Sequence, residues 1–358
     1  MTVIDPTTVD TERLDQLMGL AVGDFGAMAS GVLVYVGDRL GIYRALADGG
    51  PASAAELAER TGLQPRLLRE WLSNQAAGAY VTYDPSSERF SLTPEQAFAL
   101  ADDTSPVYLG GLAEVVLSAA VDADKVIAGL RGGGLHWHEH DERLFSGTER
   151  FFRPGYVANL VPSWIPALDG VEARLRTGIR VADLGCGHGA STVVMALAFP
   201  ASTFVGYDYH APSIDAARKA ASEAGVADRV SFEIQTAQAF TGGPFDLAAL
   251  FDSLHDMGDP VGAARRIKEQ LAPDGTLLLV EPNAGDTLSD NLNPVGRLFY
   301  AASTLVCTGN AVAQGGGDEV LGAQAGESRT RAVFEAAGWS AFRRATETPF
   351  NAVYEVRP

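Results

Sequence analysis

The chain has 358 residues, of which 46% are hydrophobic and 20% are charged, a composition typical of globular proteins long enough for two domains. A formal net charge of −18 disfavours nucleic acid and anionic membranes as partners, because both attract basic surfaces. The first residues lack the basic and apolar parts of a signal peptide, and we expect no apolar run of membrane-spanning length. Two cysteines, Cys186 and Cys307, exclude a disulfide framework. We therefore expect a cytoplasmic protein with no membrane partner.

The first hundred residues predict a small, mainly helical domain behind a loose arm over residues 1–22. The expected elements are a glycine-interrupted helix, two further helices and a β-hairpin, at residues 25–46, 51–62, 65–78 and 80–92. Helix, helix and hairpin in this order are typical of a winged helix-turn-helix. Acidic residues outnumber arginines here and lysine is absent, whereas phosphate contact needs a basic cluster. We therefore expect this domain not to bind DNA.

The remainder of the chain predicts a helical connector followed by an α/β domain. Strands are expected at residues 180–184, 203–207, 230–235, 245–250 and 276–281, with helices between them. Such alternation predicts a parallel sheet with right-handed crossovers. A close strand pair at residues 339–346 and 350–356 is expected to end the chain. The predicted domains are a winged helix at 1–100, a connector and substrate lid at 101–178, and a ligand-binding domain at 179–358.

The segment VADLGCGHG, residues 181–189, predicts a strand and a glycine turn that lets the backbone approach a ligand closely. Asp208 ends the following strand, where a ribose carried on that turn would lie. The spacing of Gly185 and Gly187 departs from the dinucleotide fingerprint G-x-G-x-x-G. Asp183, just before the turn, would repel a pyrophosphate and favour a cation or an amino group. The segment therefore predicts a nucleoside-cofactor site.

This D-x-G-x-G-x-G pattern resembles motif I of the class I S-adenosylmethionine (SAM) dependent methyltransferases. A terminal antiparallel strand pair is also the ending of that fold, and a plain dinucleotide fold lacks it. With its winged helix, the chain looks closest to an actinobacterial group of such enzymes, similar to small-molecule O-methyltransferases. The resemblance implies a Rossmann-like fold, SAM as cofactor and S-adenosylhomocysteine as product. It also implies a homodimer formed through the N-terminal domain.

The resemblance further implies where the cofactor binds. Asp183 would lie near the methionine part of SAM and Asp208 would bond both ribose hydroxyls. The segment after the third strand would hold the adenine, with Gln235 or Gln238 facing its amine. The expected cofactor-binding residues are Asp183, Gly185, Gly187, Asp208, Tyr209, Gln235, Thr236, Ala237, Phe251 and Asp252.

The segment LHDMGD, residues 254–259, resembles the L-H-D-W-x-D stretch of the same O-methyltransferases, with Met257 in place of the tryptophan. In that family the histidine, here His255, is the general base. Because the sulfonium of SAM is already activated, the enzyme needs only to align the acceptor and remove a proton, which suits an imidazole. Glu281 ends the fifth strand and matches the glutamate that orients this base.

Aromatic residues and three alternating histidines lie in the connector. The residues expected to contact the substrate are Phe152, Tyr156, Trp164 and, from a later insertion, Tyr300. If extended, His136, His138 and His140 would share one face and could bind Zn²⁺. No cysteine is nearby and methyl transfer from a sulfonium needs no metal, so we expect no metal. Pocket lining, a dimer contact or simple loop placement remain open for these histidines.

These features favour SAM-dependent methyl transfer to a small, largely apolar acceptor, with a hydroxyl as the methylated group. Two alternatives stay open. One is a winged-helix regulator that senses SAM or an apolar ligand, and the other is an enzyme with non-methyl chemistry on the same fold. A nicotinamide dehydrogenase is disfavoured by the glycine spacing and by the terminal strand pair. The acceptor and the methylated atom are not determined by the sequence.

Overall fold

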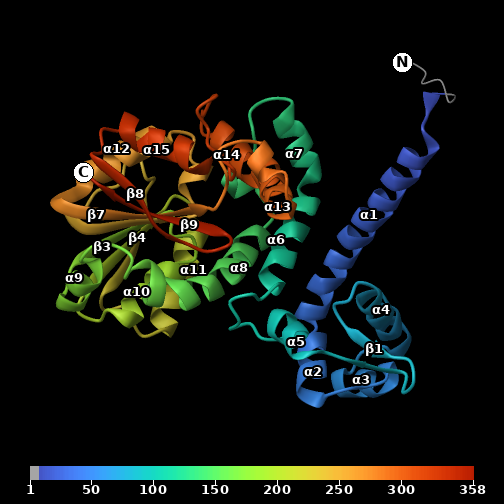
Figure 1. Ribbon diagram of the computed structural model, residues 1–358. Coiled ribbons are helices and arrows are strands. Elements are labelled where there is room, and N and C mark those ends of the chain that lie inside the picture. Colours follow the sequence, from blue (N-terminus) through green and yellow to red (C-terminus); the bar gives the residue numbers. More distant parts are fainter. Residues whose placement is uncertain (1–7) are drawn as a thin grey trace. The chain divides into compact units, whose positions relative to one another are not determined.

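The computed structural model describes residues 8–358, so residues 1–7 of the predicted arm lie outside the described residues. The chain divides into two compact units, one ending at Leu117 and the other spanning Ser118–Pro358 (Figure 1). The part of the predicted connector beyond residue 117 belongs to the same unit as the sheet. The division into three functional domains stays a prediction.

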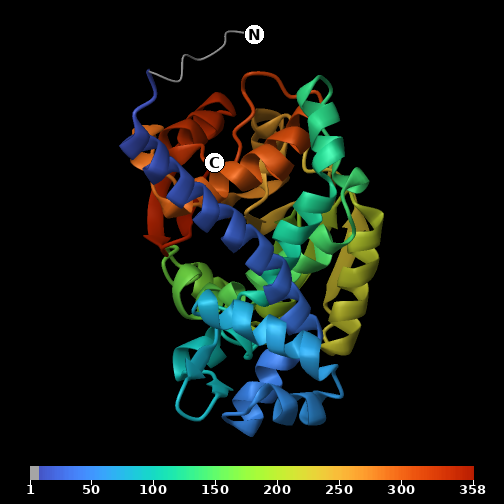
Figure 2. The ribbon, with the colours of Figure 1, turned by 90° about the vertical axis from the view of Figure 1, so that its right-hand side faces the viewer.

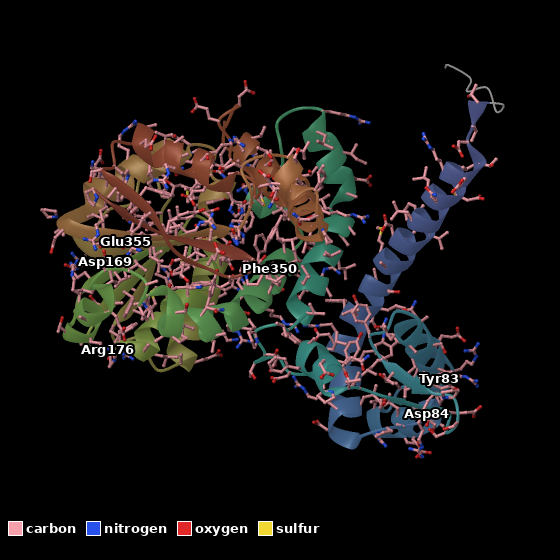
Figure 3. The ribbon with its side chains drawn as sticks, in the orientation of Figure 1. Tyr83, Asp84, Asp169, Arg176, Phe350 and Glu355 are labelled. Atoms are coloured by element: carbon pink, nitrogen blue, oxygen red, sulfur yellow. The ribbon has the colours of Figure 1, made fainter. Side chains whose placement is uncertain are left out.

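The first unit is helical with one small hairpin. Its elements are α1 Thr11–Arg39, α2 Ile42–Gly49, α3 Ala54–Thr61, α4 Pro65–Ala77, β1 Thr82–Asp84, β2 Arg89–Ser91 and α5 Pro94–Leu100, and α6 Gly110–Val121 crosses the unit boundary. β1 and β2 pair antiparallel, and Tyr83 and Asp84 lie on this hairpin (Figure 3). The predicted winged-helix arrangement is confirmed.

Local chemistry explains the helices of this unit. Ser53 and Glu56 form a capping box that starts α3, each side chain bonding the other residue's backbone N–H. Trp71 of α4 donates its indole N–H to the Leu33 carbonyl at 2.8 Å. A Cβ on Gly37 would lie 2.2 Å from the Trp71 ring, so only glycine lets α1 approach α4 this closely.

The predicted loose arm is wrong over residues 11–22, and the glycine-interrupted helix expected at residues 25–46 is interrupted only at Gly41. Asp10 caps a continuous helix α1 by accepting the N–H groups of Glu12 and Arg13, and this helix runs to Arg39 through five glycines. The break comes only at Gly41, whose φ is 67°. Isolated glycines lower helix propensity by about 1 kcal/mol each without ending a helix.

α1 is largely exposed. Its buried residues, Ser30, Val34 and Gly37, all lie in its second half, and the first half extends away from the other elements of its own unit (Figures 1 and 2). An 18-residue window of α1 has a mean hydropathy of 1.7 and is 6% buried. By length and composition α1 could cross a membrane, which corrects the expectation that no such segment exists.

The second unit alternates helices with strands. The strands are β3 Arg180–Leu184, β4 Thr203–Asp208, β5 Val230–Ile234, β6 Phe245–Phe251, β7 Leu271–Pro282, β8 Ala341–Glu347 and β9 Asn351–Arg357. The α-helices are α7 Ala123–Leu130, α8 Arg143–Asn159, α9 Val171–Thr177, α10 Ala190–Ala198, α11 Ala211–Glu223, α12 Pro260–Gln270, α13 Pro294–Ala302, α14 Thr308–Ala313 and α15 Gly326–Ala336. Short helical turns are η2 Trp137–Glu139, η3 Leu160–Trp164, η4 Leu254–Asp256, η5 Ser289–Asn291 and η6 Ser303–Cys307.

The seven strands form one sheet in the order β5-β4-β3-β6-β7-β9-β8. β5, β4, β3, β6 and β7 pair in parallel, whereas β9 pairs antiparallel with both β7 and β8. The strand order reverses direction between β3 and β6, which creates the crevice where ligands of α/β sheets bind. The Rossmann-like sheet with a terminal antiparallel pair is confirmed.

Alternate residues of the central strands face two separate cores. Along β6, Leu247, Ala249 and Phe251 pack in one core, and Ala248 and Leu250 pack in the other. α8, α9, α10 and α11 cover the first face, and α12 and α15 cover the second (Figure 1). Burial on both sides explains the continuous apolar runs of the central strands, residues 247–251 of β6 and 277–280 of β7, whereas the edge strands β5 and β8 carry exposed polar residues.

Candidate active site

Four acidic side chains lie at the carboxyl ends of four adjacent parallel strands. Asp183 is the penultimate residue of β3, and Asp208 is the last residue of β4. Asp252 directly follows β6, and Glu281 is the penultimate residue of β7. Parallel strands end at the same edge of a sheet, so the fold brings these carboxylates to one crevice. This edge of the sheet is therefore the candidate active site.

The glycine turn after β3 is tied to the end of β4. Gly185 and Gly187 have φ values of 69° and 51°, in the left-handed region that favours glycine. The Gly187 N–H donates to Asp208 Oδ2 at 3.0 Å, and the other Asp208 oxygen accepts the His210 N–H at 2.8 Å. Burial raises the pKa of Asp208. Each carboxylate oxygen keeps a lone pair for a further donor, such as a ribose hydroxyl.

Only one of the two carboxylate oxygens of Asp183 has hydrogen-bond partners. Its Oδ2 accepts the hydroxyls of Ser191 and Thr192 at 2.7 and 2.6 Å, whereas Oδ1 is buried without a hydrogen-bond partner. Burial raises the pKa of this carboxyl to about 6. A buried acceptor without a donor is costly, so the site is suited to a ligand that brings a donor or a cation. The ammonium of SAM carries both, and Asp183 fits it.

The segment expected to hold the adenine follows β5. The Gln235 amide is engaged within its own loop, since it donates to Glu233 at 2.7 Å and accepts the Thr241 N–H at 3.0 Å. Ala237 is buried, and Thr236 starts the turn that follows Gln235. The Gln238 amide, the alternative partner for an adenine, donates to the Asp259 carbonyl at 3.3 Å.

Two predicted cofactor residues flank the crevice from other strands. Tyr209 follows Asp208 and donates its hydroxyl to Asn310 at 3.1 Å. Asp252 has a φ of 48°, which is unusual for a residue with a side chain. Both of its carboxylate oxygens accept from the Asn351 side-chain amide nitrogen, at 2.9 and 3.0 Å. Burial raises its pKa well above the usual range. Phe251 just before it is buried.

His255 and Glu281 form a buried dyad. His255 Nδ1 lies 2.5 Å from Glu281 Oε2, and Glu281 Oε1 accepts the Leu254 N–H at 3.0 Å. Both side chains are 6% exposed. A carboxylate can only accept, so Nδ1 carries the proton and Nε2 is the atom left for chemistry.

Nearby charges set the basicity of His255. Burial alone would lower its pKa, but the carboxylates of Glu281 and Asp256 outweigh burial and raise the pKa well above 6.5. Asp256 Oδ1 lies 3.4 Å from His255 Nε2. The imidazole is therefore a stronger base than a free histidine.

Three of the four aromatic residues predicted to contact substrate, Phe152, Tyr156 and Trp164, pack on the face of the sheet that α8 covers. Tyr156 lies 5.3 Å from Phe251 between ring centroids, and its pKa is raised by burial and by the nearby site carboxylates, including Asp252 and Asp183. Phe152 stacks on Tyr156, Trp164 is 1% exposed in the core, and Tyr300 is half-buried on α13.

The three alternating histidines do not share one face. Residues 137–139 form the short helix η2, so the side chains diverge from the extended arrangement that the metal alternative required. His136 and His138 stack on each other with ring centroids 5.3 Å apart. His140 is buried instead, with Nδ1 3.1 Å from Asp122.

Sequence reasoning missed Asn310 and Cys307. The buried Asn310 amide donates to the Asp256 carbonyl at 3.0 Å and accepts from the Trp137 N–H and the Tyr209 hydroxyl, each at 3.1 Å. It therefore ties the base-bearing turn η4 to two other segments. Both residues belong to the insertion after β7, residues 283–325, and their type and spacing carry no recognisable motif.

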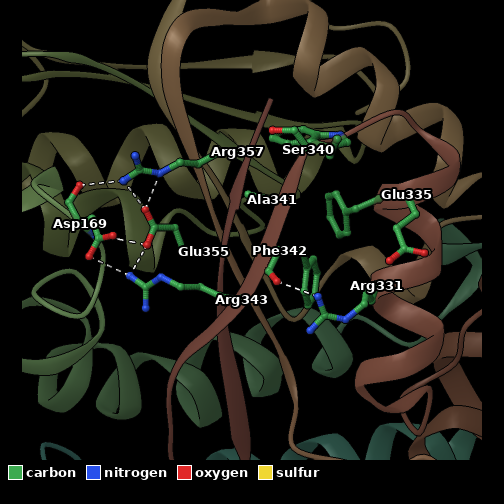
Figure 4. A pocket seen from close by; sticks show the side chains of 11 residues that line it. Asp169, Arg331, Glu335, Ser340, Ala341, Phe342, Arg343, Glu355 and Arg357 are labelled. Carbon is green, nitrogen blue, oxygen red and sulfur yellow. Dashed lines mark hydrogen bonds and ion pairs between the residues drawn. The ribbon is translucent and has the colours of Figure 1, made fainter.

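A pocket of about 470 Å³ lies elsewhere, against β8, β9 and α15 (Figure 4). Arg343 and Arg357 line it, and both are paired with Glu355, so their charges are not available to an anion. Because β9 runs antiparallel to β7 with Ala352 opposite Glu281, the Glu355 end of β9 lies away from the active-site edge. We assign the chemistry to the crevice, not to this pocket.

Comparison with known proteins agrees with this geometry. Residues 175–338 match the family described as a methyltransferase domain, and residues 28–102 match an Rv2258c-like winged HTH domain. A 27-O-demethylrifamycin SV methyltransferase of Amycolatopsis mediterranei (strain S699) is 32% identical over 187 residues, which cover 49% of this chain and 63% of that protein. The matched part of the chain thus spans less than two thirds of that curated relative.

Solved structures share the fold over nearly the whole chain. The mitomycin 7-O-methyltransferase MmcR has a TM-score of 0.70 and 20% identity, with 98% of this chain and 100% of that chain covered. Human N-acetylserotonin methyltransferase in complex with SAM has a TM-score of 0.67 and 17% identity, with 99% of both chains covered. At this identity the similarity establishes the fold alone.

The sheet and the crevice have the class I methyltransferase fold. More particularly, residues 175–338 match a methyltransferase domain, and they follow a segment, residues 28–102, that matches a winged HTH domain.

Proposed function

We propose that the protein transfers the methyl group of SAM to a hydroxyl of a small, largely apolar acceptor, with His255 as the general base. The observation that carries this proposal is the buried contact between His255 Nδ1 and Glu281 Oε2 at the edge that also holds the glycine turn. SAM supplies a methyl group already activated on a sulfonium, so the protein has to position and deprotonate the acceptor.

The residues divide this work between them. Asp183 Oδ1 accepts from the ammonium of the cofactor, and Asp208 accepts from its ribose hydroxyls. His255 Nε2 takes the proton of the acceptor hydroxyl, and Glu281 stabilises the imidazolium that forms. Gly185, Gly187, Tyr209, Gln235, Thr236, Ala237, Phe251 and Asp252 complete the proposed cofactor site, and Phe152, Tyr156, Trp164 and Tyr300 shape the acceptor side.

The relatives support a small-molecule acceptor. Those described above are named for methyl transfer to demethylrifamycin SV, mitomycin and N-acetylserotonin. The aromatic cluster around Tyr156 offers apolar surface next to the crevice. A screen of phenolic and hydroxylated compounds with SAM, read by formation of S-adenosylhomocysteine, tests the proposal. Loss of turnover in His255→Ala with unchanged SAM affinity is the expected result, and full turnover in that variant would falsify the role of the base.

We also propose that α1 forms a homodimer with a second copy of the chain. Apolar side chains recur along α1 at alternating steps of four and three residues, namely the exposed Leu14, Met18, Phe25, Met28 and Val32 and the half-buried Ala21. This spacing is the seam of a two-stranded coiled coil. It lies opposite Ser30, Val34 and Gly37, the residues that α1 buries within its own unit.

The winged domain is proposed to serve assembly rather than DNA recognition. Arg66 of α4 pairs with Glu70 of the same helix, which leaves little positive charge for phosphates. A cytoplasmic location fits the two cysteines, Cys186 and Cys307, which are both unpaired and buried.

A further inference from the structure

Three different metal-ligating side chains converge beside the proposed base. One nitrogen of His255, one carboxylate oxygen of Asp256 and the Cys307 sulfur all lie within 4.8 Å of one another. His255 and Asp256 belong to η4, whereas Cys307 ends η6 in the insertion after β7. Among residues 8–358, no other group of three or more His, Cys, Asp or Glu side chains is close enough together to hold a metal ion.

The hydrogen bonds around this cluster leave its potential metal-ligating atoms facing one another. Because Glu281 occupies His255 Nδ1, the lone pair of Nε2 is directed away from Glu281. Asp256 Oδ1 lies 3.4 Å from Nε2 but is buried without a hydrogen-bond partner. The Cys307 thiol also contacts both residues, so a proton on Nε2, the thiol proton or a cation can lie between this oxygen and the ring nitrogen.

The surrounding structure holds these donors in place. The Asp256 carbonyl accepts from the amides of Asn310 and Gln314, each at 3.0 Å, which fixes the backbone of η4. Glu281 on the far nitrogen of His255 supplies the carboxylate–histidine support that metal-ligating histidines usually have. Such support reduces the cost of ordering a ligand set when a metal binds.

We propose that His255 Nε2, Asp256 Oδ1 and the Cys307 sulfur bind a soft divalent cation, best matched by Zn²⁺, which competes with the acceptor for the base. Nitrogen, oxygen and sulfur donors together suit Zn²⁺, whereas Mg²⁺ and Ca²⁺ prefer oxygen alone. On binding, the Cys307 thiol releases its proton to solvent, and the thiolate, the imidazole nitrogen and the carboxylate become three ligands. A fourth position stays open for water.

The consequence for catalysis rests on the proposed function. Nε2 has one lone pair, so it cannot coordinate a metal and accept the proton of the acceptor hydroxyl at the same time. A bound cation would therefore stop methyl transfer without touching the glycine turn or Asp208. Of the three ligands Asp256 is the one that is partly exposed, at 18%, so an ion would meet the cluster on the Asp256 side.

Cobalt provides a spectroscopic test that does not depend on turnover. Co²⁺ is titrated into the full-length, metal-free protein, and the thiolate-to-cobalt charge-transfer band in the near ultraviolet is recorded. We expect one equivalent to give this band, Zn²⁺ to abolish it, and Cys307→Ala to lack it. Cys186→Ala is the matched control, because Cys186 is the other buried cysteine and should leave the band intact. Circular dichroism confirms that both variants fold.

Absence of the band in the wild-type protein, or its persistence in Cys307→Ala, would overturn the site. In a parallel assay Zn²⁺ is expected to lower methyl transfer at least tenfold, with full recovery after chelation and unchanged SAM affinity by calorimetry. Cobalt binding without zinc inhibition would overturn the competition. Failure of the metal-free protein to methylate any acceptor would instead refute the proposed function, and the cobalt spectrum would still decide the site.

Discussion

His255 Nδ1 and Glu281 Oε2 are 2.5 Å apart, and the second oxygen of the same carboxylate is held by the Leu254 N–H at 3.0 Å. Glu281 is therefore fixed at both oxygens, and it fixes the imidazole in turn. A buried carboxylate in this position sets both the tautomer and the basicity of the ring. The pair determines how the activity should respond to pH.

We predict that kcat/KM rises with pH through the pKa of His255, at a pH above that of a free histidine. The pKa is raised because the carboxylates of Glu281 and Asp256 outweigh burial, and the base is competent only when deprotonated. Glu281→Gln removes a negative charge, so the rising limb should move to lower pH, and kcat should fall by about 10²- to 10⁴-fold. Glu347→Gln, at an exposed position on β8, is the control. A limb that stays in place in Glu281→Gln would contradict the dyad.

Asp183 should make SAM binding depend on pH. Its pKa is raised to about 6 by burial, so the carboxyl is largely protonated below that pH and a cationic cofactor must displace the proton. Affinity for SAM should therefore increase as the pH rises through about 6 and level off above it. The free energy of unfolding changes with pH in the opposite direction. The raised pKa of Asp183 stabilises the folded protein at low pH, and this contribution is lost as the pH rises through about 6.

The isosteric variant Asp183→Asn separates charge from shape. It should weaken SAM binding by about 10- to 100-fold at neutral pH, the range expected for one hydrogen bond to a charged group. Its affinity should also lose the pH dependence, which calorimetry at several pH values would measure. Asp215→Asn on the exposed face of α11 is the matched control. An unchanged pH profile in Asp183→Asn would show that another group binds the ammonium.

Asn310 is predicted to position the turn that bears the base. Asn310→Ala removes hydrogen bonds to the Asp256 carbonyl, the Trp137 N–H and the Tyr209 hydroxyl, and each buried group left unpaired costs about 1–3 kcal/mol. We expect a lower melting temperature and a lower kcat. The rising limb of the pH profile of kcat/KM should stay at the same pH. Asn293→Ala, which removes the cap of α13, should lower the melting temperature without changing kcat. Equal effects of both variants on kcat would argue against a positioning role.

The local features of the sheet could be predicted from sequence because each depends on neighbouring residues. Alternating apolar residues define β6, and the left-handed φ of Gly187 requires the residue type that the motif supplies. The extent of α1 does not follow from the local pattern, because its glycines suggest interruptions and the Asp10 cap starts the helix within the predicted arm. Tertiary packing of the second half of α1 against α4 is not visible in a local pattern.

The contacts of the insertion after β7 were also beyond sequence reasoning. Cys307 and Asn310 reach His255 and Asp256 across about fifty residues of chain, and only the fold brings them together. The His255–Glu281 pair spans 26 residues, but it was expected from a resemblance rather than from spacing. Long-range polar contacts of this kind leave no periodic signal.

Dimerisation through α1 should depend on one face of the helix. Phe25 and Met28 are 73% and 61% exposed and lie on the proposed seam. Burying such a side chain contributes about 1.5–3 kcal/mol, so Phe25→Glu with Met28→Glu should weaken a dimer by at least about 100-fold. Analytical ultracentrifugation should then show a monomer, whereas Leu20→Glu, which is exposed off the seam, should leave the dimer intact. Co-sedimentation of the wild-type protein with lipid vesicles, lost equally in all these variants, would instead identify α1 as a membrane-binding helix.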